Sequence, residues 1–376
     1  METPTDAVAE LEKRLKSLQE RGVTILDPRQ TYLDPAVQLE RISAGAVLYP
    51  GTRLVGARTY LAPGAKVGTE GPATVENSVL GERSEVASGF VSGAVLLEKA
   101  KLGSNSHVRE GTLLEEEAST AHAVGLKQTI LMSYVTFGSL INFCDALVCG
   151  GTSRRDHSEV GSGFIHFNFT PQGKQGDKAT PSLVGDVVRG MFLKEPRIFL
   201  GGMGGMVGPL KVGFGSITAA GQVARKNVPE NHLVSEGTPQ ISKEFTPGRV
   251  DPAERRTGPN LEYIGNLVAL KAWYEDVRLR RIPDGKEFEH LRVVTREAAA
   301  NLELCIQERI TRLKSFLAER VEGKAQIEYT VPPCPLKVQP DGAPYVEWVK
   351  SVPKEFEEQA KGWLQAMVAG VKVTYQ

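Results

Sequence analysis

The sequence has little of what marks several protein classes. Its four cysteines are scattered with no CxxC pair, which favours reduced thiols in a cytoplasmic protein over disulfides or a zinc site. No apolar run approaches the ~20 residues that span a bilayer, and the charged N-terminal stretch lacks the apolar segment of a signal peptide. The 45 basic and 45 acidic residues cancel, so no net field draws the chain to nucleic acid or anionic lipid. We therefore expect a cytoplasmic protein that binds neither nucleic acid nor membrane, with no metal in its site.

Glycine, in contrast, is abundant, with 39 residues that concentrate before residue 225. From Val47 onward an aliphatic residue returns every six or seven positions, as at Leu54, Leu61 and Val67, with glycine or another small residue beside it. A six-residue strand and turn cannot bury its apolar side chain until equivalent neighbours stack above and below it. This fixed short period therefore predicts a left-handed parallel β-helix of hexapeptide repeats.

The period stops after Val228, and the rest of the chain shows helical spacing. Apolar residues recur on one face of the segments Asn260 to Arg281 and Phe288 to Val321, which predicts amphipathic helices. The predicted organisation has four parts: an N-terminal helix and lead-in over 1–39, the β-helix over 40–230, a linker over 231–257 and a C-terminal α-helical domain over 258–376.

The repeat is interrupted between Leu147 and Ser182. Two polar stretches lie there, Ser153 to His157 and Phe169 to Lys178, and both are too irregular for coils of a β-helix. Loops that project from a rigid scaffold commonly carry binding residues. We therefore expect functional side chains in this interruption.

Several short segments between residues 100 and 228 occur in the order found in a known family. They are His107 to Thr112, Leu126 to Ile130, Phe167 to Phe169, Gly213 to Gly221 and Arg225 to Val228. This order resembles the acetyltransferase half of the bifunctional glucosamine-1-phosphate acetyltransferase/N-acetylglucosamine-1-phosphate uridyltransferase family, which serves UDP-N-acetylglucosamine biosynthesis. No nucleotide-binding βαβ unit or glycine-rich phosphate loop precedes the predicted β-helix, so we do not expect uridyl transfer.

The resemblance implies a homotrimer with sugar-phosphate sites between neighbouring subunits. It implies that Arg109 and Lys127 hold a phosphate or diphosphate, that Asn168 bonds a sugar hydroxyl, and that Lys174 or Lys178 closes over the anion. Cations and amides are also the groups that a sugar phosphate requires, because the dianion needs charge-assisted hydrogen bonds and the hydroxyls need neutral partners.

The sequence departs from the family at the catalytic position. Ser139 stands where the family has a histidine base, and Asn142, a further substrate-binding candidate, stands where it has a tyrosine. A serine without a partner base cannot take a proton from an ammonium group near neutral pH. Two histidines of the interruption are therefore candidate bases, His166 and His157, of which we expect His166 to share a face with Asn168 by strand alternation.

The resemblance also implies an acetyl-coenzyme A site on the later coils. Its candidate residues are Gly202, where the family has a serine, and Ala219 and Ala220. Three hypotheses follow for the whole protein. It is an acyl-coenzyme A-dependent acyltransferase acting on an amino-sugar phosphate or nucleotide sugar, a sugar-nucleotide-binding protein that has lost the chemistry, or a scaffold that presents the helical domain.

Overall fold

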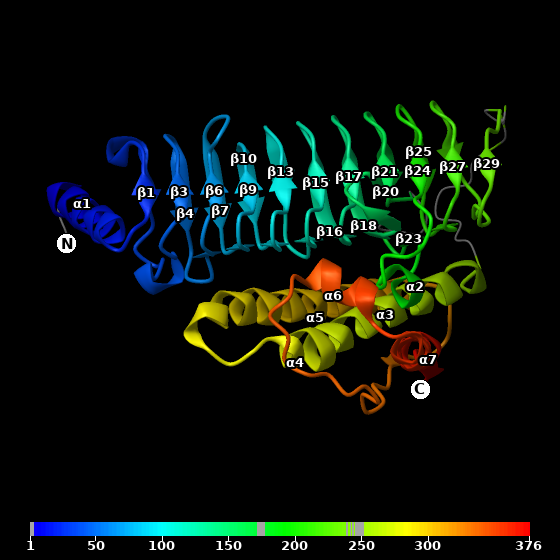
Figure 1. The fold of residues 1–376 in the computed structure, drawn as a ribbon. Coiled ribbons are helices and arrows are strands. Elements are labelled where there is room, and N and C mark those ends of the chain that lie inside the picture. Colours follow the sequence, from blue (N-terminus) through cyan, green and yellow to red (C-terminus); the bar gives the residue numbers. More distant parts are fainter. Residues whose placement is uncertain (1–3, 171–176, 238–239, 241, 243, 245–251) are drawn as a thin grey trace.

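The computed structural model describes residues 4–376 apart from 171–176, 238–239, 241, 243 and 245–251. It consists of a long rod of stacked coils with a group of helices lying along one side (Figure 1). The predicted parallel β-helix followed by a C-terminal helical region is confirmed. The expected linker, 231–257, lies partly outside the described residues.

Helix α1 (Pro4–Glu20) lies at the N-terminal end of the rod (Figure 1). Its apolar side chains Leu15 and Leu18 are buried, as the spacing predicts. Arg14 donates a hydrogen bond of 2.9 Å to the carbonyl oxygen of Asp34, which ties the helix to the first coils. The strands of the rod begin at Thr24 and end at Val234.

Each coil contributes strands to three flat faces, which we call A, B and C. Face A is a sheet of eleven parallel strands. Its strands are β1 (Thr24–Ile25), β3 (Val47–Leu48), β6 (Lys66–Val67), β9 (Glu85–Val86), β12 (Lys101–Leu102), β15 (Ser119–Thr120), β17 (Thr136–Phe137), β21 (Glu159–Val160), β24 (Phe199–Leu200), β27 (Ile217–Thr218) and β29 (Leu233–Val234).

Faces B and C are joined into one sheet because β16 (Gly125–Leu131) and β18 (Asn142–Val148) bend around their common edge. Besides the first parts of these two, face B contains β2 (Tyr32–Leu33), β4 (Thr52–Val55), β7 (Ala73–Glu76), β10 (Gly89–Ser92), β13 (Ser106–Val108), β22 (Ile165–Phe167), β25 (Gly205–Val207) and β28 (Val223–Ala224). Besides their last parts, face C contains β5 (Tyr60–Leu61), β8 (Val79–Leu80), β11 (Val95–Leu96), β14 (Leu113–Leu114), β23 (Ser182–Val184) and β26 (Lys211–Val212).

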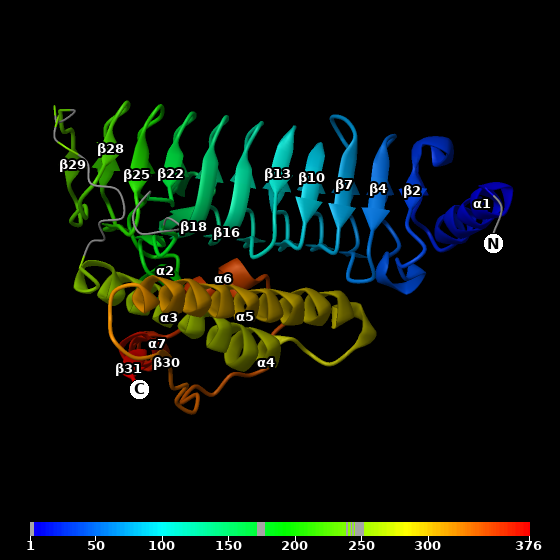
Figure 2. The same ribbon diagram turned by 180° about the vertical axis from the view of Figure 1, so that it is seen from behind.

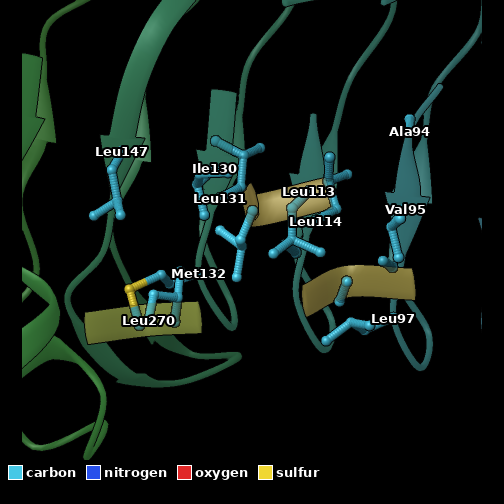
Figure 3. Packing of buried hydrophobic residues seen from close by; sticks show 14 of the residues in the cluster. Ala94, Val95, Leu97, Leu113, Leu114, Ile130, Leu131, Met132, Leu147 and Leu270 are labelled. Carbon is cyan, nitrogen blue, oxygen red and sulfur yellow. The ribbon is translucent and has the colours of Figure 1, made fainter. Parts of the chain in front are cut away.

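The aliphatic residues of the repeat point into the rod and stack on their equivalents in neighbouring coils. Leu96, Leu114 and Leu131 occupy consecutive coils of face C in parallel register, and all three are fully buried. Figure 3 shows Leu114 and Leu131 of this stack, with Leu270 of the helical region in the same group of buried side chains. Each coil therefore supplies the core that its neighbours need, as expected of a solenoid.

The corners between faces do not depend on glycine alone. Many are formed by other residues in the left-handed backbone region, among them Leu140 and Asp145 with φ near 60°. Glycine is required where the coils approach most closely: Gly89 has φ of 112°, and a Cβ built there would lie 2.1 Å from the carbonyl oxygen of Ser106.

The interruption of the repeat is partly coiled. Strands β21 and β22 continue the stack through residues 159–167, so only the flanking stretches leave it. One is a short antiparallel hairpin of β19 (Gly151–Ser153) and β20 (Asp156–His157). The other, between β22 and β23, contains part of the chain outside the described residues, including the candidate Lys174.

The helical region covers face C (Figures 1 and 2). Helix α5 contacts β8 and β11, whereas α3 contacts β23. The helices are α2 (Val187–Gly190), α3 (Glu254–Trp273), α4 (Leu279–Arg281), α5 (Glu289–Ala318), α6 (Tyr345–Ser351) and α7 (Lys354–Ala369); a π-helix (Tyr274–Arg278) joins α3 to α4, three 3-10 turns span Pro28–Gln30, Leu39–Arg41 and Lys286–Phe288, and a hairpin pairs β30 (Ala325–Glu328) with β31 (Lys372–Tyr375).

Candidate functional site

Two cations lie on consecutive coils of face B. Val108 pairs with Leu126 in the parallel register of β13 and β16, so the next residues, Arg109 and Lys127, lie side by side. Their neighbour on the following coil is Cys144, which pairs with Lys127. Since successive strand residues alternate, these side chains point outward while Val108 and Leu126 are buried in the rod.

Asn142 completes this group, because it leads the same strand as Cys144 and pairs with Gly125. Arg109 and Asn142 are exposed, and Lys127 is half-buried. Arg109 donates a long contact of 3.9 Å from Nη2 to Cys144 Sγ, and that thiol lies 3.6 Å from Asn142 Oδ1. Burial raises the pKa of the Cys144 thiol, which keeps it neutral near pH 7.

Lys127 already has an anionic partner. Its Nζ lies 2.7 Å from Oε1 of Glu110, and this hydrogen bond lowers the pKa of the Glu110 carboxyl. Both side chains are partly solvated, so the pair contributes little to stability. A phosphate arriving at Lys127 would compete with Glu110 for this ammonium group.

Asn168 lies at the far edge of face B, just after β22. Its Nδ2 donates a hydrogen bond of 2.6 Å to Oδ2 of Asp145, a residue at the corner between faces B and C. The other oxygen of Asp145 is 2.8 Å from Nη2 of Arg309 on α5. Lys178 is exposed at the end of the loop that follows Asn168.

His166 points into the rod. It is 3% exposed and lies against the ring of Phe143, with 5.4 Å between ring centroids. Its Nδ1 bonds the carbonyl oxygen of Cys144, and its Nε2 is 2.9 Å from Ser182 Oγ. The alternation of β22 puts Ile165 and Phe167 outside and His166 inside, and Asn168 follows the strand with its amide bonded to Asp145.

His157 lies on another side of the rod. It belongs to the β19–β20 hairpin and lines a hollow on face A with Glu159 and Phe199. Its Nδ1 is 3.0 Å from the carbonyl oxygen of Arg154, and burial lowers the pKa of the imidazole. The structure therefore does not bring His157 to the cations of face B.

Ser139 has a histidine partner that the sequence reasoning missed. Its Oγ is 2.9 Å from Nδ1 of His122, one coil earlier, and its backbone N–H donates to Ser162 Oγ at 3.0 Å. The three residues lie at the corner between faces A and B, at the edge of the face that carries Arg109 and Lys127. The strand register could have revealed this pair. Thr120 pairs with Phe137, and His122 and Ser139 each lie two residues after these strand residues.

The residues considered for acetyl-coenzyme A continue the same corner. The registers of β17, β21, β24 and β27 place Ser139, Ser162, Gly202 and Ala220 on consecutive coils, with Ala219 beside the last. A Cβ on the preceding Gly201 would lie 2.5 Å from the Ala220 nitrogen, so the coils approach closely at this position. The next residues of the same turns, Leu140 and Met203, are exposed apolar side chains.

In the described part of the chain, no group of three or more His, Cys, Asp or Glu residues is placed to hold a metal ion. No helix there has both the length and the apolar character needed to cross a bilayer.

No protein-family model matches the sequence. The chain is 32% identical over 237 residues to the bifunctional protein GlmU of Clavibacter sepedonicus, which is 63% of this chain and 43% of that protein. It is 31% identical over 219 residues to GlmU of Nocardia farcinica, or 58% and 39% of the two chains, and 28% identical over 242 residues to GlmU of Thermosipho melanesiensis, or 63% and 48%. Over about 60% of its length the chain is thus distantly related to GlmU proteins, and it spans less than half of theirs.

Two solved structures also match the chain. One is the polySia-specific acetyltransferase NeuO, at 8% identity and a TM-score of 0.19, covering 63% of this chain and 95% of that one. The other is a putative acetyltransferase of Bacillus cereus, at 10% identity and a TM-score of 0.15, covering 76% and 94%.

Proposed function

We propose that this protein binds an amino-sugar phosphate or a nucleotide sugar on face B and transfers an acyl group to it from acyl-coenzyme A. The observation that carries the proposal is the stacking of Arg109 on Lys127, two cations on adjacent coils of one open face. A phosphate or diphosphate can accept charge-assisted hydrogen bonds from both. The distant relation to GlmU proteins supports the same class of ligand.

The remaining groups fit the sugar. Asn142 offers a neutral amide on face B, Asn168 offers one beside Asp145 at the corner between faces B and C, and Lys178 lies at the end of the adjoining loop. Lys174 belongs to that loop and keeps its proposed role in closing over the anion, although it lies outside the described residues. The phosphate would lie against the two cations, Arg109 and Lys127, and the sugar hydroxyls against the two amides. This division matches the groups that a sugar phosphate requires.

For the chemistry we propose the His122–Ser139 pair. The substrate amine attacks the thioester carbonyl carbon, a C–N bond forms, and the C–S bond breaks. The amine proton passes to Ser139 Oγ as the Ser139 hydroxyl gives its own proton to Nδ1 of His122, 2.9 Å away. The imidazolium then protonates the leaving thiolate, which balances the step. This pair is favoured over His166, whose ring nitrogens are both engaged inside the rod.

The coenzyme is proposed to lie along the corner formed by Ser162, Gly202 and Ala220. The small residues Ser162, Gly202 and Ala220 leave room there for an extended ligand, and the exposed side chains of Leu140 and Met203 adjoin them. The proposal further includes a cytoplasmic homotrimer. A closed three-fold ring is one of the common symmetric assemblies of identical subunits.

The alternative is a protein that binds the sugar nucleotide without turning it over. It is favoured by the serine at the position of the family's histidine. The two are separated by thermal-shift measurements with UDP-N-acetylglucosamine, glucosamine 1-phosphate and acetyl-coenzyme A, followed by an assay for free coenzyme A thiol. Any ligand that prefers the folded state raises its stability.

Acyl transfer predicts that acetyl-coenzyme A binds and that thiol is released in the presence of the amino sugar. His122→Ala and Ser139→Ala should then lower turnover by ~10²–10⁴-fold with sugar binding unchanged. His157→Ala, on face A, is the matched control and should keep turnover. Binding of the sugar nucleotide with no thiol release from any acyl donor would support the binding protein, and silence with all three ligands would favour the scaffold.

A further inference from the structure

We infer that the C-terminal helical region helps to form the sugar site. Arg309 of α5 holds Asp145, and Asp145 orients the amide of Asn168. This inference rests on the proposed function. It assigns Arg309 and Asp145 as positioning residues, and it fixes the kind of ligand group that Asn168 receives.

The link consists of two short contacts in series. Arg309 Nη2 lies 2.8 Å from Oδ1 of Asp145, and Oδ2 of Asp145 accepts a hydrogen bond of 2.6 Å from Nδ2 of Asn168. The side chains of Arg309 and Asp145 are only 2% and 6% exposed. Asn168 is half-buried at the edge of face B, so the link joins helix α5 to this edge.

The position of Asp145 explains how it serves both sides. It is the corner residue of β18, with φ of 60°, between the part of the strand in face B and the part in face C. Helix α5 lies along face C, where it contacts β8 and β11. A carboxylate at this corner therefore reaches the helix with one oxygen and the edge of face B with the other.

Arg309 is poorly satisfied apart from this ion pair. Its Nε and Nη1 are buried and have no hydrogen-bond partner among the described residues. The contact to Glu308 is long, at 3.8 Å. A buried guanidinium with unpaired donors costs free energy that an apolar side chain would avoid. The arrangement is understandable if the role of Arg309 is to hold the Asp145 carboxylate in place.

The carboxylate of Asp145 determines which end of the Asn168 amide is available. A carboxylate accepts hydrogen bonds and cannot donate one, so it must face the NH₂ group of Asn168. The amide oxygen Oδ1 is then directed away from Asp145. A ligand group that meets this oxygen must donate a hydrogen, which means a sugar hydroxyl or the N–H of an acetamido group.

The backbone of Asn168 is fixed as well. Its carbonyl oxygen accepts a hydrogen bond of 2.6 Å from Thr180 Oγ1, across the loop. With both backbone and amide held, Asn168 has little freedom to turn its NH₂ group toward the ligand. The site therefore selects for a hydrogen donor at this position.

The test is a double-mutant cycle read by calorimetric binding of two probes, UDP-N-acetylglucosamine and inorganic diphosphate. Arg309→Met and Asn168→Ala should each weaken the sugar nucleotide by about 3–10-fold, the worth of one neutral hydrogen bond, and should leave diphosphate binding unchanged. The double variant should be no weaker than Asn168→Ala alone, because both changes remove the same contact. Arg312→Met, on the exposed side of α5, is the matched control and should bind like the parent.

Arg309→Met leaves Asp145 buried without its cation and can fail to fold. The variant Arg309→Met/Asp145→Asn removes both charges and serves the same purpose with less cost. Sugar-nucleotide affinity equal to the parent's in a folded Arg309 variant, or additive losses in the cycle, would overturn the inference. A parent that binds diphosphate but not the sugar nucleotide, or neither probe, would remove the proposed function and this inference together; binding without acyl transfer would leave it intact.

Discussion

Removal of the Arg278 side chain should undo a buried charge cluster between the helices and the rod. Arg278, in the π-helix, is 6% exposed. Its Nη1 lies 3.3 Å from Oε1 of Glu115, its Nη2 bonds Glu116, and its guanidinium lies 3.5 Å above the ring of Tyr345. Arg278→Met leaves two buried carboxylates without their cation, which costs about 3–5 kcal/mol of unfolding free energy.

The pH dependence of this loss has a definite sign. Burial raises the pKa of Glu115 even in the parent, and Arg278 opposes that rise. Without Arg278 the folded pKa rises further above its unfolded value of 4.5. A carboxyl whose folded pKa is raised costs more stability as the pH increases through that range. The deficit of Arg278→Met should therefore be largest at neutral pH and smaller toward pH 5.

Urea unfolding of the parent and the variant at pH 7 and pH 5 measures both effects. The control is Arg280→Met, an exposed arginine of the same segment whose ion pair with Asp276 is on the surface, and it should cost less than about 1 kcal/mol. A loss for Arg278→Met that equals the control's, or a deficit that grows as the pH falls, would refute the reasoning about this cluster.

Three further results are expected. Glu110→Gln should tighten inorganic diphosphate by about 2–5-fold in calorimetry, because it frees Lys127 from a surface ion pair; unchanged or weaker binding would contradict this. Burial lowers the folded pKa of His166, so its contribution to the unfolding free energy should be present above pH 6.5 and lost as the pH falls. In urea unfolding, His166→Gln should lack this pH dependence. The same pH dependence in parent and variant would contradict the prediction. Light scattering at micromolar concentration should give three times 40.8 kDa, and a monomer would exclude the trimer.

The rod could be predicted because its pattern is local and repeated. The aliphatic period required stacked coils, and stacking fixed the register that brings Arg109 to Lys127. The amphipathic spacing likewise predicted the long helices that became α3 and α5. Neither pattern predicted that these helices fold back onto face C of the rod.

The burial of three carboxylates on the rod could not be predicted, because it depends on where the C-terminal helices dock. Glu115, Glu116 and Asp145 lie on coils where a charged residue normally faces water, and only the docked helices cover them. The orientation of His166 depended on where the corner before β22 falls, because a shift of one residue exchanges the inner and outer faces of a strand. His122 required knowledge of which residue lies one coil below Ser139.

The most direct test of the account is calorimetric titration of UDP-N-acetylglucosamine into the parent, Arg109→Ala, Lys127→Ala and a control, Lys101→Ala, from face A. The account predicts that the parent binds, that each face B variant loses about 1.5–3 kcal/mol of binding free energy with little change in folding, and that the control matches the parent. Equal binding by the parent and both face B variants would contradict it and place the anion elsewhere on the rod.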